Sequence, residues 1–289
     1  MLSGIEVFMV NGMQKYSGAS VLWVSVSPSL KFFDLPLLQN LTKHRSLAKP
    51  SGSGIARWEY AQSLDEASTL EGATTMLVGY LESCDRPVHL AGHGLSGVVA
   101  MQAAVRCPEK VRSLAVLSVA VLPGLTWQAH YYLQRMMTPC SQTRVLANCA
   151  RSLWGTTSPY SIKSLVSLLE KDLLLSPSPH SLYQVAKLDP VLVSVPKFVM
   201  GGGHDFVISP VVFQQWRDQM GPGDQFCQLP EGSHFFHTAS PDWVAGELMQ
   251  FWMQHEDSQS ETLNALKDCG SGGAIETLPS GRSVRFFRR

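Results

Sequence analysis

One segment, residues 88–106, constrains the fold of this 289-residue chain more than any other. It opens with a short apolar run at residues 88–91, passes through a glycine-rich turn at residues 92–97, and continues into small, mostly apolar residues. Glycines allow a sharp turn with positive φ, and small side chains let a helix pack closely on a sheet. We therefore expect a buried strand, a tight turn and a helix over residues 95–106.

The same alternation of apolar runs and helical segments recurs along the chain. Further strands are expected at residues 5–10, 21–26, 55–60, 111–121, 196–200 and 225–229, and helices at residues 65–82, 211–220 and 242–254. Strands that alternate with helices indicate an α/β fold, with a mostly parallel sheet and helices on both faces. The pair Asn11-Gly12 is typical of a tight hairpin turn after the first strand.

Residues 125–190 interrupt this alternation with helical segments alone. The pattern predicts helices at residues 127–137, 142–154 and 162–175, separated by prolines. We interpret this region as a helical cap inserted at one edge of the sheet. The expected organisation is a core made of residues 1–124 and 191–254, a cap at residues 125–190 and a flexible tail at residues 255–289.

Charge and composition exclude some classes of protein. Lys plus Arg and Asp plus Glu number 23 each, so the formal net charge is zero, and a nucleic-acid binder would need a basic face. Only 16% of residues are charged and 45% are hydrophobic, which favours a large buried sheet or an apolar pocket. No apolar run reaches the roughly 18 residues of a membrane-spanning helix.

The sequence also gives no sign of secretion or of a cofactor. The first residues lack a basic signal-peptide region, and the six cysteines form no C-x-x-C pair, so we expect a cytoplasmic protein with reduced thiols and no metal. The glycines at residues 201–203 lack the rest of a phosphate-binding pattern, and no cofactor is expected. A small-molecule substrate or ligand is the expected partner, and the oligomeric state stays open.

Three of the predicted strands end in residues that carry chemistry. Gly94 lies at the centre of the first turn, where the G-x-S-x-G pattern of a nucleophile elbow has its serine. Asp205 follows a later strand and a glycine turn, and His234 follows the strand after that. The carboxyl ends of parallel strands meet at one edge of a sheet, so we expect these residues to lie together. Acyl transfer needs a nucleophile, a histidine and a carboxylate, and this chain has the last two.

In order and spacing these segments resemble the α/β-hydrolase superfamily, whose triad runs Ser, Asp or Glu, then His along the chain. The resemblance covers most of residues 1–254 and is strongest at residues 87–117. It implies His234 as the catalytic base, Asp205 as its partner and the amide of Leu95 as one donor to an oxyanion. Gly94 occupies the position of the family's serine. The strand at residues 21–26 does not lead into the usual His-Gly pair, so the second donor stays unassigned.

Other residues near these segments have two possible roles. Ser96 is expected to point away from the side-chain position of residue 94 and to cap the helix, although it is also a candidate nucleophile. His93 is expected to point into the sheet, and His237 to be structural. At the start of the cap, Trp127, His130 and Tyr131 either line a substrate site or pack the cap on the sheet.

These observations leave three hypotheses for function. The first is a hydrolase-like enzyme on a small, largely apolar substrate, in which the His234–Asp205 pair activates water or removes a proton without a serine. The second is a non-catalytic protein that binds a ligand or a partner in the same pocket. The third is ester hydrolysis through Ser96. The first hypothesis is the one that we carry forward.

Overall fold

The computed structural model describes residues 6–9, 19–43, 54–60, 62, 65–155, 158 and 160–270, with side chains described for those between 19 and 256. The chain divides into two compact units, Met1–Trp252 and Met253–Arg289, and the architecture below is that of the first. Its strands are β1 (Glu6–Met9), β2 (Val21–Ser25), β3 (Ile55–Glu59), β4 (Val88–His93), β5 (Val111–Leu117), β6 (Lys197–Gly202) and β7 (Gln225–Leu229).

These strands form one sheet in the order β1-β3-β2-β4-β5-β6-β7, and every pair of neighbours is parallel. The predicted parallel α/β sheet is therefore confirmed. The predicted hairpin is wrong, because β1 and β2 are not neighbours and each pairs in parallel with β3. Parallel strands need a long crossover and cannot be joined by a two-residue turn. Residues 11–12 themselves lie outside the described residues.

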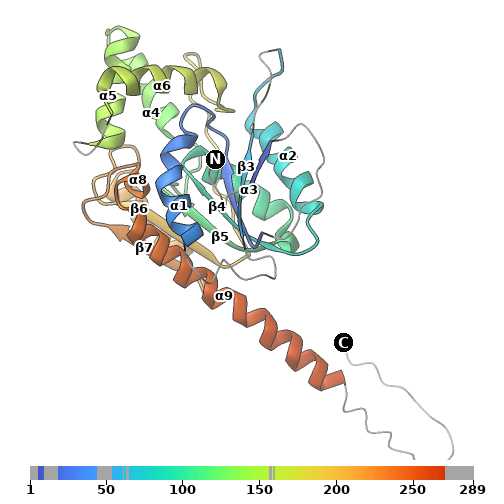
Figure 1. Ribbon diagram of the computed structural model, residues 1–289. Helices are drawn as coiled ribbons and strands as arrows, with labels where there is room; N and C mark the ends of the chain where they lie inside the picture. Colours follow the sequence, from blue (N-terminus) through green and yellow to red (C-terminus); the bar gives the residue numbers. More distant parts are fainter. Residues whose placement is uncertain are drawn as a thin grey trace, which may run out of the picture. The chain divides into compact units, whose positions relative to one another are not determined.

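Helices connect the strands and cover both faces of the sheet (Figure 1). They are α1 (Leu35–Lys43), α2 (Leu70–Glu82), α3 (Leu95–Arg106), α4 (Trp127–Met137), α5 (Gln142–Trp154), α6 (Ile162–Leu175), α7 (Pro210–Gln214), α8 (Phe236–Ala239) and α9 (Pro241–Gly270), with short 3-10 helices η1 (Lys31–Asp34), η2 (Pro108–Lys110) and η3 (Gln215–Gln219). Helix α1 was not predicted from the sequence. The helix expected at residues 211–220 is instead α7 followed by η3, and α9 runs well beyond its expected end at residue 254.

Side chains along β2 point alternately to the two faces of the sheet, and each face is covered by an apolar layer. Leu22 and Val24 are buried in the layer that contains α2 and α3. Val21 and Trp23 are buried in the opposite layer, which contains α1 and the beginning of α9. All five residues of β2 are buried, as expected for a central parallel strand.

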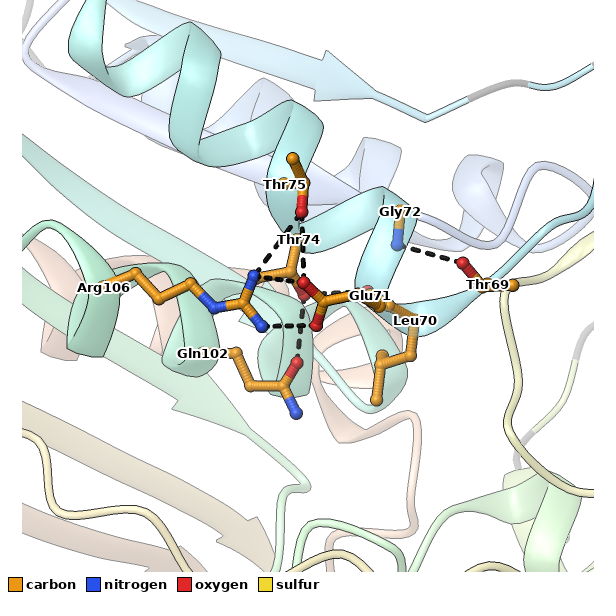
Figure 2. A network of polar contacts seen from close by, with 8 residues as sticks. All are labelled: Thr69, Leu70, Glu71, Gly72, Thr74, Thr75, Gln102 and Arg106. Atoms are coloured by element: carbon orange, nitrogen blue, oxygen red, sulfur yellow. Dashed lines mark hydrogen bonds and ion pairs between the residues drawn. The ribbon is translucent and has the colours of Figure 1, made fainter.

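Polar contacts between α2 and α3 add to the first layer (Figure 2). Thr69 caps α2 by accepting a hydrogen bond from the Gly72 amide at 3.0 Å, which explains why the helix begins at residue 70 and not at residue 65. Arg106, in the last turn of α3, donates two hydrogen bonds to the Glu71 carboxylate at 2.7 and 2.5 Å. The second contact joins the first turn of α2 to the last turn of α3 at the protein surface.

Helices α4, α5 and α6 lie between β5 and β6 in the sequence and begin and end where the sequence predicts. A hydroxyl caps each of them, because Thr126, Ser141 and Ser161 accept hydrogen bonds from amides in the first turns. The helices share an apolar cluster with Phe33 and Phe235, which come from outside the inserted segment. We call α4, α5 and α6 the insertion helices.

Candidate active site

Gly94 forms the turn between β4 and α3. Its φ is +52° and its ψ is −127°, a conformation that glycine adopts freely and other residues adopt only with strain. A Cβ built at Gly92 would lie 2.8 Å from a backbone carbon of Ser96, and one at Gly97 would lie 2.6 Å from Val119 Cγ2, so both positions need glycine for space. At Gly94 the nearest atom to such a Cβ, outside the two adjoining residues, is His234 Nε2, at 3.8 Å. The turn therefore has room for a side chain at residue 94, directed toward His234.

Asp205 and His234 form a buried pair opposite this turn. His234 Nδ1 lies 2.8 Å from Asp205 Oδ2, and both side chains are at most 2% exposed. The other carboxylate oxygen accepts hydrogen bonds from the amides of Val207 and Ile208 at 2.8 and 2.9 Å. The carboxylate thus holds the proton of a neutral imidazole on Nδ1 and leaves Nε2 as an acceptor that faces Gly94.

Two side chains also hold the backbone of His234. Its carbonyl oxygen accepts a hydrogen bond from Ser118 Oγ at 2.8 Å and lies 2.9 Å from His93 Nε2, which donates to it. Ser118 has a φ of +49°, and its strained backbone directly follows β5. This role of Ser118 was not predicted, because the strand expected at residues 111–121 includes the residue, whereas β5 ends at Leu117.

His93 does not point into the sheet as expected. Its ring borders a pocket and lies 4.9 Å from the ring of His234 and 4.4 Å from that of His237, measured between centroids. Burial, together with the charges of His237 and His234, holds the pKa of His93 well below its usual value. His93 therefore stays neutral beside the buried pair, with Nε2 protonated.

The pocket lies at the carboxyl edge of the sheet, where β2 and β4 end, and Gly94, Leu95 and His234 line it. Leu95 is the first residue of α3, so its amide has no acceptor within the helix. The amide of Val26, which follows β2, donates to Ser96 Oγ at 3.0 Å. The expected capping role of Ser96 is therefore wrong, because its hydroxyl oxygen binds a neighbouring loop. No hydrogen bond joins Ser96 to His234, although both side chains are described.

A sequence model of the alpha/beta hydrolase family matches residues 33–247 of this chain. The chain belongs to the alpha/beta hydrolase family. An uncharacterized protein of Nostoc sp. (strain PCC 7120) is 40% identical over 232 residues, which cover 80% of this chain and 90% of that protein. An uncharacterized protein of Synechocystis sp. (strain PCC 6803) is 39% identical over 244 residues, covering 84% of this chain and 94% of that protein.

Solved structures with the same fold include enzymes at low sequence identity. A membrane phospholipase A has a TM-score of 0.64 and 16% identity, and the match covers 83% of this chain and 80% of that one. A thermophilic esterase from Thermogutta terrifontis has a TM-score of 0.61 and 15% identity, with 83% of this chain and 91% of that one covered. These similarities show the fold.

The remaining candidates of this alpha/beta hydrolase are only partly at the pocket. Trp127 lines it, whereas His130 and Tyr131 are not among the lining residues. His130 Nε2 lies 2.6 Å from Gln134 Nε2, and Tyr131 is buried within the cluster of insertion helices.

His237 is fully buried, and its Nε2 lies 3.1 Å from Asp34 Oδ1. Asp34 also accepts a hydrogen bond from Trp23 Nε1 at 2.9 Å. These contacts are those of a structural histidine, as the sequence analysis expected.

Sequence reasoning missed the wall that follows β2. Ser27, Lys31 and Asp34 line the pocket there, and Lys31 Nζ pairs with Glu59 at 2.6 Å. Their signal in the sequence is only their position after a predicted strand. Ser27 is of interest because no described residue accepts a hydrogen bond from its amide, which makes this amide a candidate second donor to an oxyanion.

A buried carboxylate connects this wall to the insertion helices. Asp172, in α6, is fully buried and accepts hydrogen bonds from Trp127 Nε1 at 3.1 Å, from Gln128 Nε2 at 3.0 Å and from Ser29 Oγ at 3.4 Å. Burial raises the pKa of Asp172 to about 7, and hydrogen bonds from Ser27 and the other donors act in the opposite direction.

The described residues contain no group of three or more His, Cys, Asp or Glu side chains that could hold a metal ion. Over the same residues, no helix has the length and hydropathy needed to cross a membrane.

Proposed function

We propose that this protein is a hydrolase-like enzyme that uses the His234–Asp205 pair, without a serine at residue 94, on a small and largely apolar substrate. The observation that carries the proposal is the position of His234 Nε2. This atom lies 3.8 Å from where the side chain of residue 94 would begin, and Nδ1 is held by Asp205. The pair keeps the arrangement of a general base, and glycine leaves space beside it for a water molecule or a substrate atom.

In the proposed reaction, His234 Nε2 accepts a proton from water as the water oxygen attacks the substrate's carbonyl carbon. The carbonyl π electrons move onto its oxygen, which then faces the amide of Leu95 at the start of α3, with the amide of Ser27 as the second candidate donor. Collapse of this intermediate re-forms the carbonyl and breaks the bond to the leaving group, which takes the proton from His234. Asp205 stabilises the imidazolium ion between the two transfers.

Hydrolysis of a panel of short-chain activated esters tests this proposal. We expect wild type to turn over at least one ester, and His234→Ala to lower that rate to the level of the uncatalysed reaction. His204→Ala is a matched control, because His204 is exposed and pairs with Glu231 outside the pocket lining. A wild-type rate that persists in His234→Ala contradicts the proposal.

The alternative is a non-catalytic protein that binds a ligand or a partner in this pocket. The observation that favours it is the backbone of Gly94, since a φ of +52° strains any other residue by about 1–3 kcal/mol. A chain that no longer needs a side chain there is stabilised by glycine. Absence of turnover on every ester, together with ligand binding that His234→Ala leaves unchanged, supports this reading.

A further inference from the structure

Asp172 is a buried carboxylate that the proposed reaction does not use. It is fully buried in α6, and no ion pair joins it to another of the described residues. Burial raises its pKa to about 7, which reflects the cost of placing a charge in the interior. An apolar side chain would avoid this cost. Stability therefore does not explain the carboxylate, and its contacts indicate another role.

These contacts join two parts of the pocket that are far apart in the sequence. Asp172 Oδ2 accepts hydrogen bonds from two residues of α4, Trp127 Nε1 at 3.1 Å and Gln128 Nε2 at 3.0 Å. Oδ1 accepts one from Ser29 Oγ at 3.4 Å, and the hydroxyl of Ser27 also binds the carboxylate. Trp127 and Ser27 both line the pocket. Asp172 therefore sets the distance between α4 and the loop that follows β2.

The pocket that these parts line is small. Its volume is about 30 Å³. On the same measure, one buried water molecule needs about 10–15 Å³, so the pocket has room for roughly two or three water-sized groups. This space matches an acetyl group and excludes a longer acyl chain. His234 lines the same pocket, so an acetyl group bound there lies beside the proposed base.

We propose that Asp172 is a positioning residue, which holds Trp127 and the loop after β2 in place and thereby keeps the pocket to the size of an acetyl group. The substrate class is then an acetyl ester or a similar short acyl compound, whose leaving group lies outside the pocket. This inference rests on the proposed function and names the substrate class of the same site. The size of the pocket can also be measured by binding, without turnover.

Two substitutions at Asp172 differ in the contacts that they keep. In Asp172→Asn, the amide oxygen can accept from Trp127 and Gln128, while the NH₂ group donates to the hydroxyl of Ser29, which can act as donor or acceptor. Asp172→Leu has the same branched shape but no acceptor, so the buried N–H groups of Trp127 and Gln128 lose their partner. We expect the pocket to widen in the leucine variant and to keep its size in the asparagine variant.

The test is hydrolysis of p-nitrophenyl acetate and p-nitrophenyl hexanoate by the full-length protein, with the rate of His234→Ala subtracted. The quantity compared is the ratio of kcat/KM for acetate to that for hexanoate. Wild type favours acetate by about tenfold or more, because even one methylene group that a pocket does not fit changes this ratio by about that much. Asp172→Leu lowers the ratio by about tenfold or more, and Asp172→Asn leaves it unchanged.

A second variant and a control accompany this comparison. Trp127→Phe keeps an aromatic ring and removes the N–H that Asp172 binds, so it also lowers the ratio. This variant provides the test if Asp172→Leu does not fold. Thr74→Val is the matched control and keeps the wild-type ratio, because Thr74 is fully buried and binds Gln102 away from the pocket lining.

Four results overturn the inference: wild type without a preference for acetate, Asp172→Leu with the wild-type ratio, a ratio that falls equally in Asp172→Asn and Asp172→Leu, or values of kcat/KM that fall equally for both esters. The last result means that Asp172 contributes only to stability.

The proposed function fails separately, if wild type hydrolyses no ester or if His234→Ala keeps the rate. The affinities for the neutral ligands acetamide and hexanamide, measured by NMR, then test the size of the pocket without turnover. A preference for acetamide that Asp172→Leu removes and Asp172→Asn keeps supports the positioning role in a non-catalytic protein. A preference that Asp172→Leu leaves unchanged overturns it.

Discussion

Replacement of Gly94 by serine is the sharpest test of the site's geometry. A Cβ at this position meets no atom closer than His234 Nε2 at 3.8 Å, apart from its own chain neighbours. The serine Oγ lies one covalent bond further along, which brings it within the roughly 2.6–3.2 Å that a nucleophile and its base require. We therefore expect Gly94→Ser to complete a triad with His234 and Asp205.

The same substitution has a cost that can be worked out from the backbone. With φ at +52°, any side chain at residue 94 strains the turn by about 1–3 kcal/mol, and the open space around the Cβ adds no clash. Gly94→Ala has the same strain without a nucleophile and is the matched control. Both variants should lose similar free energy of unfolding, measured by urea denaturation, and only the serine variant should gain activity.

The assay is hydrolysis of short-chain activated esters with detection of an initial burst. A serine nucleophile in a complete triad contributes about 10⁶ in kcat, so even an imperfect site should raise the rate of Gly94→Ser above that of Gly94→Ala by at least about a hundredfold. A burst equal to the enzyme concentration would show the acyl-enzyme. A folded Gly94→Ser protein that hydrolyses no faster than Gly94→Ala refutes the reasoning, because the base then does not face residue 94.

Three further changes test the surroundings of the site. In the Gly94→Ser protein, Asp205→Asn should lower kcat by about 10⁴-fold, because an amide no longer fixes the proton of His234 on Nδ1; steady-state kinetics with unchanged activity would contradict this role. Asp172 has a raised pKa of about 7, so between about pH 4 and pH 7 the folded protein keeps a proton that the unfolded chain has lost, and the free energy of unfolding falls as the pH rises. The free energy of unfolding of Asp172→Asn should not fall in this way. Urea denaturation at pH 4 and at pH 8 should therefore show the variant gaining up to about 4 kcal/mol relative to wild type as the pH rises. Trp154 is 3% exposed and stacks on Phe235 with ring centroids 4.4 Å apart, so Trp154→Ala should destabilise the fold by about 3–5 kcal/mol in the same assay, whereas a loss below about 1 kcal/mol would mean that the stack is unimportant.

The sequence predicted best those elements whose ends are fixed by local chemistry. The insertion helices begin after Thr126, Ser141 and Ser161, and each hydroxyl accepts a hydrogen bond from an amide a few residues later. Such caps depend only on neighbours in the chain. The hairpin suggested by residues 11–12 failed for the opposite reason, since the pairing of β1 with β3 is a long-range choice that no two-residue signal reports.

The candidate site also has some features that the sequence predicts and others that it does not. Gly94, Asp205 and His234 could be predicted to lie together, because each follows a strand and parallel strands end at one edge of the sheet. The hydrogen bonds to the His234 carbonyl from His93 and Ser118 could not, because their acceptor is a backbone atom of a distant loop. The bond between the Val26 amide and Ser96 likewise depends on the register of two strands, which the sequence does not state.

Gly94 and the His234–Asp205 pair support different conclusions about selection on this site. Glycine removes strain at residue 94 and needs no function to explain it. The buried pair has no such explanation, because an ion pair or a polar pair in the interior can often be replaced by apolar residues at no loss of stability. Here the Asp205 carboxylate takes part in three hydrogen bonds, from the amides of Val207 and Ile208 and with His234. The imidazole of His234 presents Nε2 to the pocket. Stability alone therefore accounts for the glycine but not for the histidine, and this difference favours a protein that still uses its base.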